Sequence, residues 1–356
     1  MYKAVIAAAN GVGMNDRMDP ELRDEEVHRM EQETPILHPG LTNREIRPTL
    51  TDDEYKKLKG CYLLPEHGPT DIEPNVRYYT RDKDGEHVKF LLLKNVLVDS
   101  YIPAKIALEE ATWKVAGRTA ATGQPNPKKI TYGWFPQLPG HIEGSDFESL
   151  RTRPTLSQPG LAHGLRPMVR AMNDLLKEYL SEYYPKVLED AMKALRREDE
   201  VEAKYLAEVR NNPESPFPEK DVAKLKGMDM MGWVPEMATY TLWATVFSTL
   251  ELNKHIVFRA HEDAYNADGT LVCISAVGDW VGGRLILPRY GYGADLAPTD
   301  LLICDNHSEL HGNLGPLVGN QKSPRFSVVA FLHSHLFDYA QRKGLWTPKD
   351  TVRSDV

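Results

Sequence analysis

The chain has 356 residues and a formal net charge of −8. Hydrophobic residues make up 41% and charged residues 26% of the sequence, which is typical of a folded globular protein and excludes wholesale disorder. No stretch approaches the roughly 18 uncharged apolar residues that a membrane span needs, so we expect no membrane partner. Taken at face value, the negative charge also argues against a nucleic-acid partner.

The three cysteines, Cys61, Cys273 and Cys304, are isolated from one another. Their odd number and their spacing argue against a disulfide framework and against a zinc module of the C-x-x-C type. We therefore expect the protein in a reducing intracellular compartment. Among such compartments we expect the nucleus.

The N-terminal region, residues 1–75, is rich in proline and charge and shows little periodicity. We expect it to form an irregular cover with brief helices, one of them where Asp52 and Asp53 precede Tyr55. Residues 76–97 follow and are typical of two strands around a turn at residues 83–85.

Helical support is predicted in two places. Pro103 is typical of a first helical turn, which predicts a helix over residues 102–115. A strongly periodic stretch predicts a second helix over 167–212, broken at Pro185. The residues between them, 116–165, are rich in glycine, proline and serine and predict loops.

The C-terminal half, from Ala238, consists of short β-rich segments separated by Gly, Pro, Asn or Asp. Many short strands at close spacing predict a sandwich or barrel rather than a β-α-β sheet. The fold class is therefore α+β. We place one domain at residues 76–345 and a C-terminal tail at 346–356.

A candidate metal site begins with His261 and Asp263. Residues two apart on a strand point to the same face, so an imidazole and a carboxylate can reach one metal ion. They would supply two of the three ligands in the 2-His-1-carboxylate triad of non-haem iron oxygenases. The motif alone is weak, since His141 and His307 each begin a similar H-x-E.

A third ligand is available about fifty residues later. His311 follows the apolar segment that begins at Asp300 and stands directly before Gly312. His307 lies four residues earlier, and either histidine could complete the set.

Arg325 and Ser327 come next, at the start of an apolar strand. A guanidinium pointing into a barrel is costly unless it is paired. A dicarboxylate co-substrate would provide the bidentate partner that suits the planar guanidinium.

This ordered set, over roughly residues 85–340, resembles the Fe(II)/2-oxoglutarate dioxygenases, and in particular the TET/JBP family, which oxidises methyl groups on nucleic-acid bases. The resemblance implies a double-stranded β-helix, or jelly-roll, core flanked by helices. It implies Fe(II) and 2-oxoglutarate as cofactors. The implied iron ligands are His261, Asp263 and His311, the last favoured over His307 because its spacing and the following glycine fit the family.

The remaining site residues also come from the resemblance. Arg325, with Ser327 beside it, would hold 2-oxoglutarate, while Asn266 and His333 match positions that contact a flipped base. Stacking on that base is expected from an aromatic side chain, for which Phe258, Tyr265 and Trp280 are candidates. The Cys-rich zinc-binding segment of animal members is absent, so the chain would be a compact form of the family.

The function implied is oxidation of the methyl group of 5-methylcytosine in DNA, a step in DNA demethylation, on a base flipped out of methylated duplex DNA. Demethylation of N6-methyladenine on the same site is the nearest alternative. A small-molecule or protein hydroxylase and a catalytically inactive nucleic-acid-binding module are the others. The oligomeric state is left open.

The distribution of charge weakens the argument against DNA. Residues 101–170 contain nine Lys or Arg and five Asp or Glu, so this region is basic although the whole chain is acidic. A basic face is what phosphate contacts require.

Overall fold

The computed structural model describes residues 40–83, 85–115, 127–133, 158–180, 242–267, 269–278, 280, 282–315 and 324–334. The first 39 residues of the expected N-terminal cover, the part of the second predicted helix after residue 180, and the C-terminal tail lie outside these ranges. Most of the loop-rich stretch between the two helices lies outside them as well.

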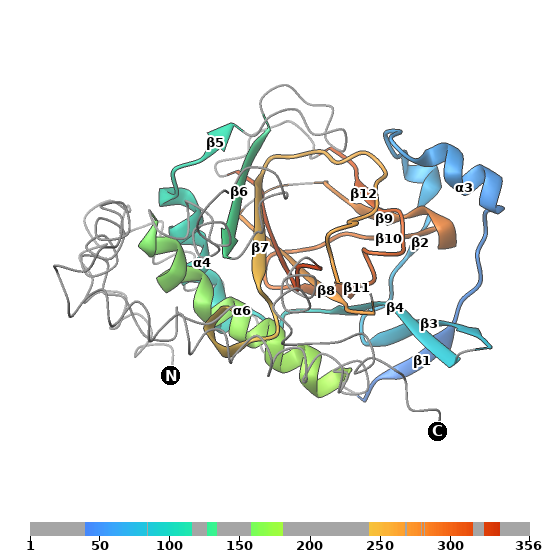
Figure 1. Ribbon diagram of the computed structural model, residues 1–356, viewed down its shortest axis with the longest axis horizontal. Helices are drawn as coiled ribbons and strands as arrows, with labels where there is room; N and C mark the ends of the chain where they lie inside the picture. The colour runs from blue at the N-terminus through green and yellow to red at the C-terminus, as the bar shows by residue number, and fades with distance from the viewer. Residues whose placement is uncertain are drawn as a thin grey trace, which may run out of the picture.

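The described strands form two sheets (Figure 1). From one edge to the other, the larger sheet has nine strands in the order β1 (Thr42–Glu45), β3 (Val76–Asp82), β4 (Gly85–Leu93), β11 (Leu301–Cys304), β8 (Val272–Val277), β13 (Phe326–Phe331), β7 (Thr249–Lys254), β6 (Lys128–Gly133) and β5 (Lys114–Val115). The smaller sheet has four strands in the order β12 (Gly312–Asn313), β9 (Leu285–Leu287), β10 (Tyr292–Ala294) and β2 (Thr70–Asp71). Short 3-10 helices occupy Pro65–His67, Leu242–Ala244 and Pro288–Tyr290.

The chain path from β7 to β13 is that of a jelly roll. It alternates between the sheets: β7, β8, β11 and β13 are antiparallel neighbours in the larger sheet, while β9, β10 and β12 lie in the smaller one. An antiparallel bridge between His261 and His311 joins the segment after β7 to the smaller sheet beside β12. The expected α+β fold with a double-stranded β-helix core is confirmed.

Alternation along the strands divides the interior into two layers. On β4, Leu91 and Leu93 face a core shared with the helices α4 (Val98–Glu110) and α6 (Pro159–Tyr179). The intervening Phe90 and Leu92 face the space between the two sheets. The helices therefore cover the outer face of the larger sheet, and its inner face is left to form the site (Figure 1).

The predicted turn between β3 and β4 is confirmed, but both helix boundaries differ from the prediction. Pro103 and Pro167 lie inside α4 and α6 rather than at their starts. Helix α4 begins five residues before Pro103, where the amide groups of Val96 and Leu97 donate to the carbonyl of Thr299. A tertiary contact therefore sets the start of this helix, and it overrides the preference of proline for the first turn.

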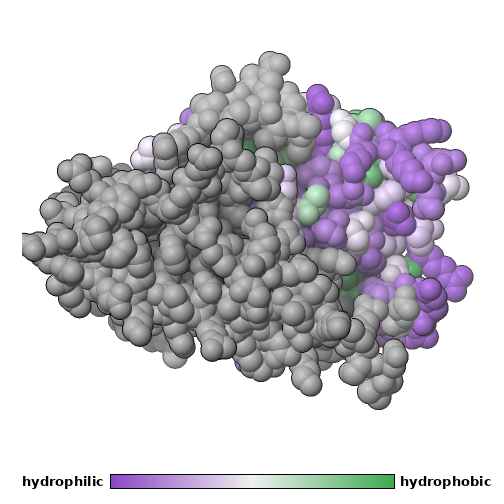
Figure 2. Space-filling model, viewed as in Figure 1, coloured by the Kyte–Doolittle hydropathy of each residue, from purple (hydrophilic) through white to green (hydrophobic). Residues whose placement is uncertain are grey.

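The described part of the N-terminal cover is more regular than expected. Helix α3 (Asp52–Leu58) is predicted correctly and begins with a capping box between Thr51 and Glu54. Strand β1 extends the larger sheet by parallel pairing with β3. Strand β2 extends the smaller sheet by parallel pairing with β10. The surface in this part of the molecule, over α3 and β3, is largely hydrophilic (Figure 2).

No helix in the described part of the chain is long and apolar enough to cross a membrane.

Candidate active site

His261, Asp263 and His311 meet at one point between the two sheets. One ligand atom from each lies within 4.8 Å of the others. The antiparallel bridge brings this about, because the amide of His261 donates to the carbonyl of His311 at 3.0 Å and the amide of His311 donates back at 2.9 Å. Asp263 lies two residues beyond the bridge. Its Oδ1 lies 3.4 Å from Nε2 of His261, and its Oδ2 lies 3.4 Å from Nε2 of His311.

Backbone carbonyls orient both imidazole rings. Nδ1–H of His261 donates to the carbonyl oxygen of Arg259 at 2.8 Å, and Nδ1–H of His311 donates to that of Glu309 at 3.1 Å. Each hydrogen bond fixes the tautomer in which Nε2 carries the free lone pair. Both lone pairs therefore face the Asp263 carboxylate, as a shared metal ion would require.

The charge state of Asp263 also suits a metal ligand. Burial alone would raise its pKa, but the interactions with the His311 and His261 imidazoles, which are favourable when the rings are protonated, outweigh burial and hold the pKa well below its ordinary value. Its backbone amide donates to the carbonyl of Asn306 at 2.9 Å. The carboxylate is therefore ionised and held in place without a proton to displace.

Arg325 and Ser327 lie at the entrance of β13, on the same side as the triad. The guanidinium of Arg325 is buried 5.5 Å from the ring of Trp280, and its Nε has no hydrogen-bond partner in the described part of the chain. Burial lowers the pKa of Arg325 to about 10. Ser327 accepts a 3.3 Å hydrogen bond from Asn253. A buried cation without a carboxylate partner fits an anionic ligand.

A single cavity of about 350 Å³ joins these groups. Its lining consists of Lys129, Glu251, Asn253, Phe258, His261, Asp263, Tyr265, Asn266, Ile274, Leu285, Asn306, His311, Gly312, Asn313, Arg325, Ser327, Val329 and Phe331. The volume lies within the usual range of about 300–1,000 Å³ for small-molecule sites. Every predicted ligand of the metal and of the co-substrate therefore faces one space.

The two predicted base-contacting residues have different positions. Asn266 lines the cavity, and its buried Nδ2 has no hydrogen-bond partner among the described residues. His333 is fully buried, is joined to Asn266 by an antiparallel bridge, and is not part of the lining. Tyr265 covers it, with the two rings stacked at 5.5 Å.

The three aromatic candidates for stacking on the base also have different environments. Tyr265 lines the cavity and is 47% exposed. Phe258 lines the cavity as well but stacks on the His261 ring at 5.2 Å. Trp280 packs against Arg325 instead.

The geometry favours His311 over His307 as the distal ligand. Among the described residues, the group that could hold a metal ion contains His311 and not His307. His311 lies on the bridge to His261, whereas His307 lies in the turn that follows β11.

Sequence reasoning missed several polar residues of the site. Asn306 donates to Asp263 at 3.5 Å, and Asn253 lies beside Ser327. Glu309 and Lys89 form a buried ion pair at 2.9 Å close to His311. Lys89 could have been identified from the sequence, because it is the one charged residue within the apolar stretch of β4. A charge in such a stretch needs a partner.

Fold and site together define an Fe(II)- and 2-oxoglutarate-dependent oxygenase. A profile of the TET/JBP family, described as the oxygenase domain of the 2OGFeDO superfamily, matches residues 146–334. This match covers more than half of the sequence, and the chain belongs to the TET/JBP family.

Other comparisons gave weaker results. No curated protein sequence matches the chain. Among solved structures, NgTET1 in complex with 5mC DNA is 14% identical over 72% of this chain and 76% of its own, with a TM-score of 0.39. OsALKBH1 is 10% identical over 68% and 97%, with a TM-score of 0.35. A putative 2OG-Fe(II) oxygenase family protein from Caulobacter crescentus is 14% identical over 68% and 77%, with a TM-score of 0.34.

The residues present fit the cofactors of this superfamily. Two imidazole nitrogens and an ionised carboxylate are the ligand set of a facial non-haem iron site, which leaves positions open for other ligands. The Arg325 guanidinium in the same cavity fits a carboxylate of 2-oxoglutarate.

Proposed function

We propose that this oxygenase oxidises the methyl group of 5-methylcytosine in DNA, with the base flipped out of a duplex into the cavity. Two points support the proposal: membership of the TET/JBP family, and a hydrogen-bonding group in the cavity that a planar base would satisfy. Nuclear localisation and duplex DNA as the partner belong to the same proposal.

The observation that carries the proposal is the amide of Asn266. Its Nδ2 is buried in the cavity wall without a hydrogen-bond partner among the described residues. A buried donor left unpaired costs about 1–3 kcal/mol, so a site of this kind favours a ligand that supplies an acceptor. The hydrogen-bonding edge of a flipped cytosine has such acceptors, and bases taken out of the stack are read in this way.

The chain's own residues then have distinct roles. His261, Asp263 and His311 would hold the iron, and Arg325 with Ser327 would bind 2-oxoglutarate in the same cavity. When bound, iron and 2-oxoglutarate supply the oxidising power for a C–H bond. Asn266 positions the base by its edge, and Tyr265 offers a face for stacking that also excludes water.

The DNA backbone would be held by lysines beside the cavity. Lys128 is exposed at the start of β6 and lies opposite Lys254 of β7 in the sheet. Desolvation and the charge of Lys128 lower the pKa of Lys254, as is expected where cations gather without enough counter-charge. A phosphate would relieve this repulsion.

The proposal is tested by mass spectrometry of nucleosides after reaction. The protein is incubated with Fe(II), 2-oxoglutarate and duplexes that contain either 5-methylcytosine or N6-methyladenine. We expect 5-hydroxymethylcytosine from the first duplex, no loss of N6-methyladenine from the second, and no product with Asp263→Ala. Loss of N6-methyladenine alone would replace our proposal with the demethylase alternative.

Asn266→Ala separates base reading from cofactor binding. We expect it to weaken activity on DNA at least tenfold while leaving the affinity for 2-oxoglutarate unchanged. A variant with full activity on 5-methylcytosine would remove the observation on which the proposal depends.

A further inference from the structure

The segment from Thr51 to Leu63, called the strap here, lies against both pieces of chain that carry the iron ligands. It consists of α3 and the loop after it, and it precedes the region matched by the family profile. Its hydrogen bonds reach residues more than 190 positions away in the sequence. It therefore joins parts of the site that are distant along the chain.

On the His311 side, the strap acts through Tyr55, which is buried with 4% of its surface exposed. The Tyr55 hydroxyl accepts a hydrogen bond from the amide of Leu310 and donates one to the carboxylate of Glu309 at 3.3 Å. The carbonyl of Glu309 is the group that orients the His311 ring. One hydroxyl thus holds the two residues directly before the distal ligand.

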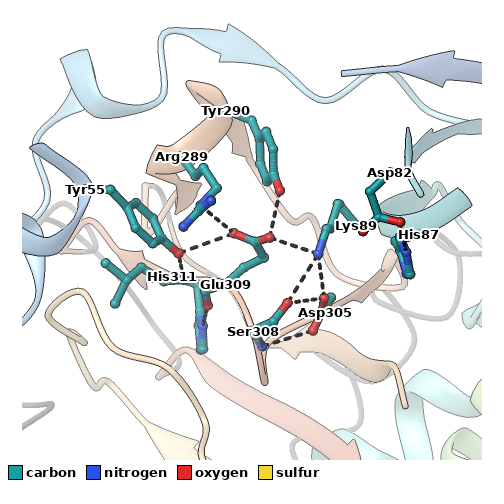
Figure 3. Close-up of polar contacts among 11 residues, drawn as sticks. Tyr55, Asp82, His87, Lys89, Arg289, Tyr290, Asp305, Ser308, Glu309 and His311 are labelled. Atoms are coloured by element: carbon teal, nitrogen blue, oxygen red, sulfur yellow. Dashed lines mark hydrogen bonds and ion pairs between the residues drawn. The ribbon is translucent and has the colours of Figure 1, made fainter. Parts of the chain in front are cut away.

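The Glu309 carboxylate has three further partners besides Tyr55 (Figure 3). Tyr290 donates to its carboxylate at 2.7 Å, Lys89 pairs with it at 2.9 Å, and Arg289 pairs with it at 3.3 Å. Arg289 also lies 4.0 Å from the centre of the Tyr55 ring. A carboxylate with this many partners has little freedom, so the Tyr55 contact connects the strap to a rigid group.

On the His261 side, the strap pairs through its backbone. The amide of Gly60 donates to the carbonyl of Ala260, and the amide of Ala260 donates to the carbonyl of Cys61, both at 2.8 Å. Lys59 pairs with Glu262 at 2.7 Å. These contacts hold the residues on either side of His261.

We propose that the strap sets the geometry of the metal site, and that Tyr55 is its positioning residue for His311. Outer partners of metal-bound histidines typically affect metal affinity about 10- to 100-fold. The proposal rests on the His261–Asp263–His311 metal site but not on the identity of the substrate.

The test uses Tyr55→Phe in the full chain, with Co(II) as the probe and no DNA or 2-oxoglutarate. The variant removes only the hydroxyl and keeps the ring against Arg289. We expect the dissociation constant for Co(II) to rise about tenfold. We also expect the visible absorption of the bound Co(II) to change, because the orientation of His311 is altered.

Tyr79→Phe is the matched control. Tyr79 lies outside the strap, on β3, and its ring contacts Arg81. We expect its Co(II) affinity and spectrum to equal those of the wild type.

A purely structural role makes a different prediction. It lowers the melting temperature of the metal-free protein but leaves the Co(II) affinity and spectrum at 25 °C unchanged, and this result would overturn the proposal. If Tyr55→Phe does not fold, Glu309→Gln tests the same contact, since the amide keeps the size of the side chain. Glu309→Gln with wild-type Co(II) binding would equally overturn the proposal.

Failure of the underlying site is distinguishable from failure of the strap. A wild-type protein that does not bind Co(II) contradicts the metal site itself. If the wild type binds Co(II) and Tyr55→Phe has the same Co(II) affinity and spectrum, only the proposal about the strap is contradicted.

Discussion

Arg325 is the residue whose environment is hardest to explain without a ligand. Its guanidinium is buried, its pKa is lowered to about 10 by burial, and its guanidinium carbon lies 5.5 Å from the centre of the Trp280 ring. Isolated buried charges are rarely retained in proteins without a partner. The simplest account is that the partner is the carboxylate of 2-oxoglutarate.

Arg325→Lys should therefore weaken 2-oxoglutarate binding even though the charge is kept. A lysine cannot form the two parallel hydrogen bonds of a guanidinium, so we expect a loss of roughly tenfold or more. Calorimetric titration of 2-oxoglutarate into Mn(II)-loaded protein measures it. The control is Arg81→Lys, because Arg81 forms an exposed ion pair with Glu86 outside the cavity. Unchanged affinity in Arg325→Lys would assign the co-substrate to another cation.

Asp305 and Lys89 form a partly buried ion pair at 2.9 Å, and Lys89 also pairs with Glu309. Burial would raise the pKa of Asp305, but the charge of Lys89 and the hydrogen bonds from Ser308 outweigh it, so the pKa is lowered. A carboxyl whose pKa is lowered in the folded state stabilises the protein above its unfolded pKa of about 3.9. That stabilisation is lost as the pH falls through the folded pKa.

Asp305→Asn should consequently cost about 2 kcal/mol of unfolding free energy at pH 7, since hydrogen bonds to charged groups are removed. The difference from the wild type should shrink as the pH falls below about 4. Urea unfolding at several pH values measures this. Asp71→Asn, at an exposed pair with Arg284, should show little effect at any pH. A difference that grows toward acid pH would contradict the sign argued here.

At the scale of the elements, the contact between α4 and α6 depends on Gly164. A Cβ at this position would overlap the Cβ of Ala107 and the carbonyl oxygen of Pro103. The helices can approach this closely only because the glycine has no side chain. The outer face of the larger sheet is covered as a result.

Gly164→Ala should destabilise the protein although alanine is the better helix former. The gain of about 1 kcal/mol in helix propensity is smaller than the cost of overpacking, which reaches about 3 kcal/mol for rigid neighbours. Thermal unfolding should show a lower melting temperature, whereas His163→Ala, at an exposed position of the same helix, should be nearly neutral. A more stable Gly164→Ala protein would show that the helices are farther apart.

Elements with strong local patterns were predictable from the sequence. The turn between β3 and β4 and the strands β8, β11 and β13 follow from β-rich apolar runs and from the breaking residues between them. The starts of α4 and α6 did not, because Pro103 and Pro167 imitate a helix N-terminus while tertiary contacts decide where each helix begins. Strands β1 and β2 are too short and too polar to show any period.

At the scale of the whole molecule, metal binding should be coupled to folding. The ligands come from two segments about fifty residues apart, which meet only in the folded state. A ligand that binds only the folded protein at about 100 times its dissociation constant adds about 2.7 kcal/mol of stability. Mn(II) should therefore raise the melting temperature of the wild type and leave that of Asp263→Ala unchanged. An equal rise in both proteins would mean that the metal binds elsewhere.

The candidate site was predictable where it depends on order along the chain. The order and spacing of four residues resemble those of the TET/JBP family, and this resemblance identified His261, Asp263, His311 and Arg325. The role of Tyr55 could not be predicted, because its partner Glu309 lies about 250 residues away and no sequence pattern around Tyr55 indicates this contact. Contacts of this kind become visible only when the sheets are assembled.

The central claim, that this site couples 2-oxoglutarate turnover to oxidation of a methylated base, is tested most directly by stoichiometry. Succinate and 5-hydroxymethylcytosine are quantified together after reaction with two duplexes that differ only in a methyl group on cytosine. We predict that the methylated duplex stimulates succinate formation and yields about one hydroxymethylated base per succinate in the first turnovers. Equal succinate from both duplexes, with no oxidised base, would contradict the account.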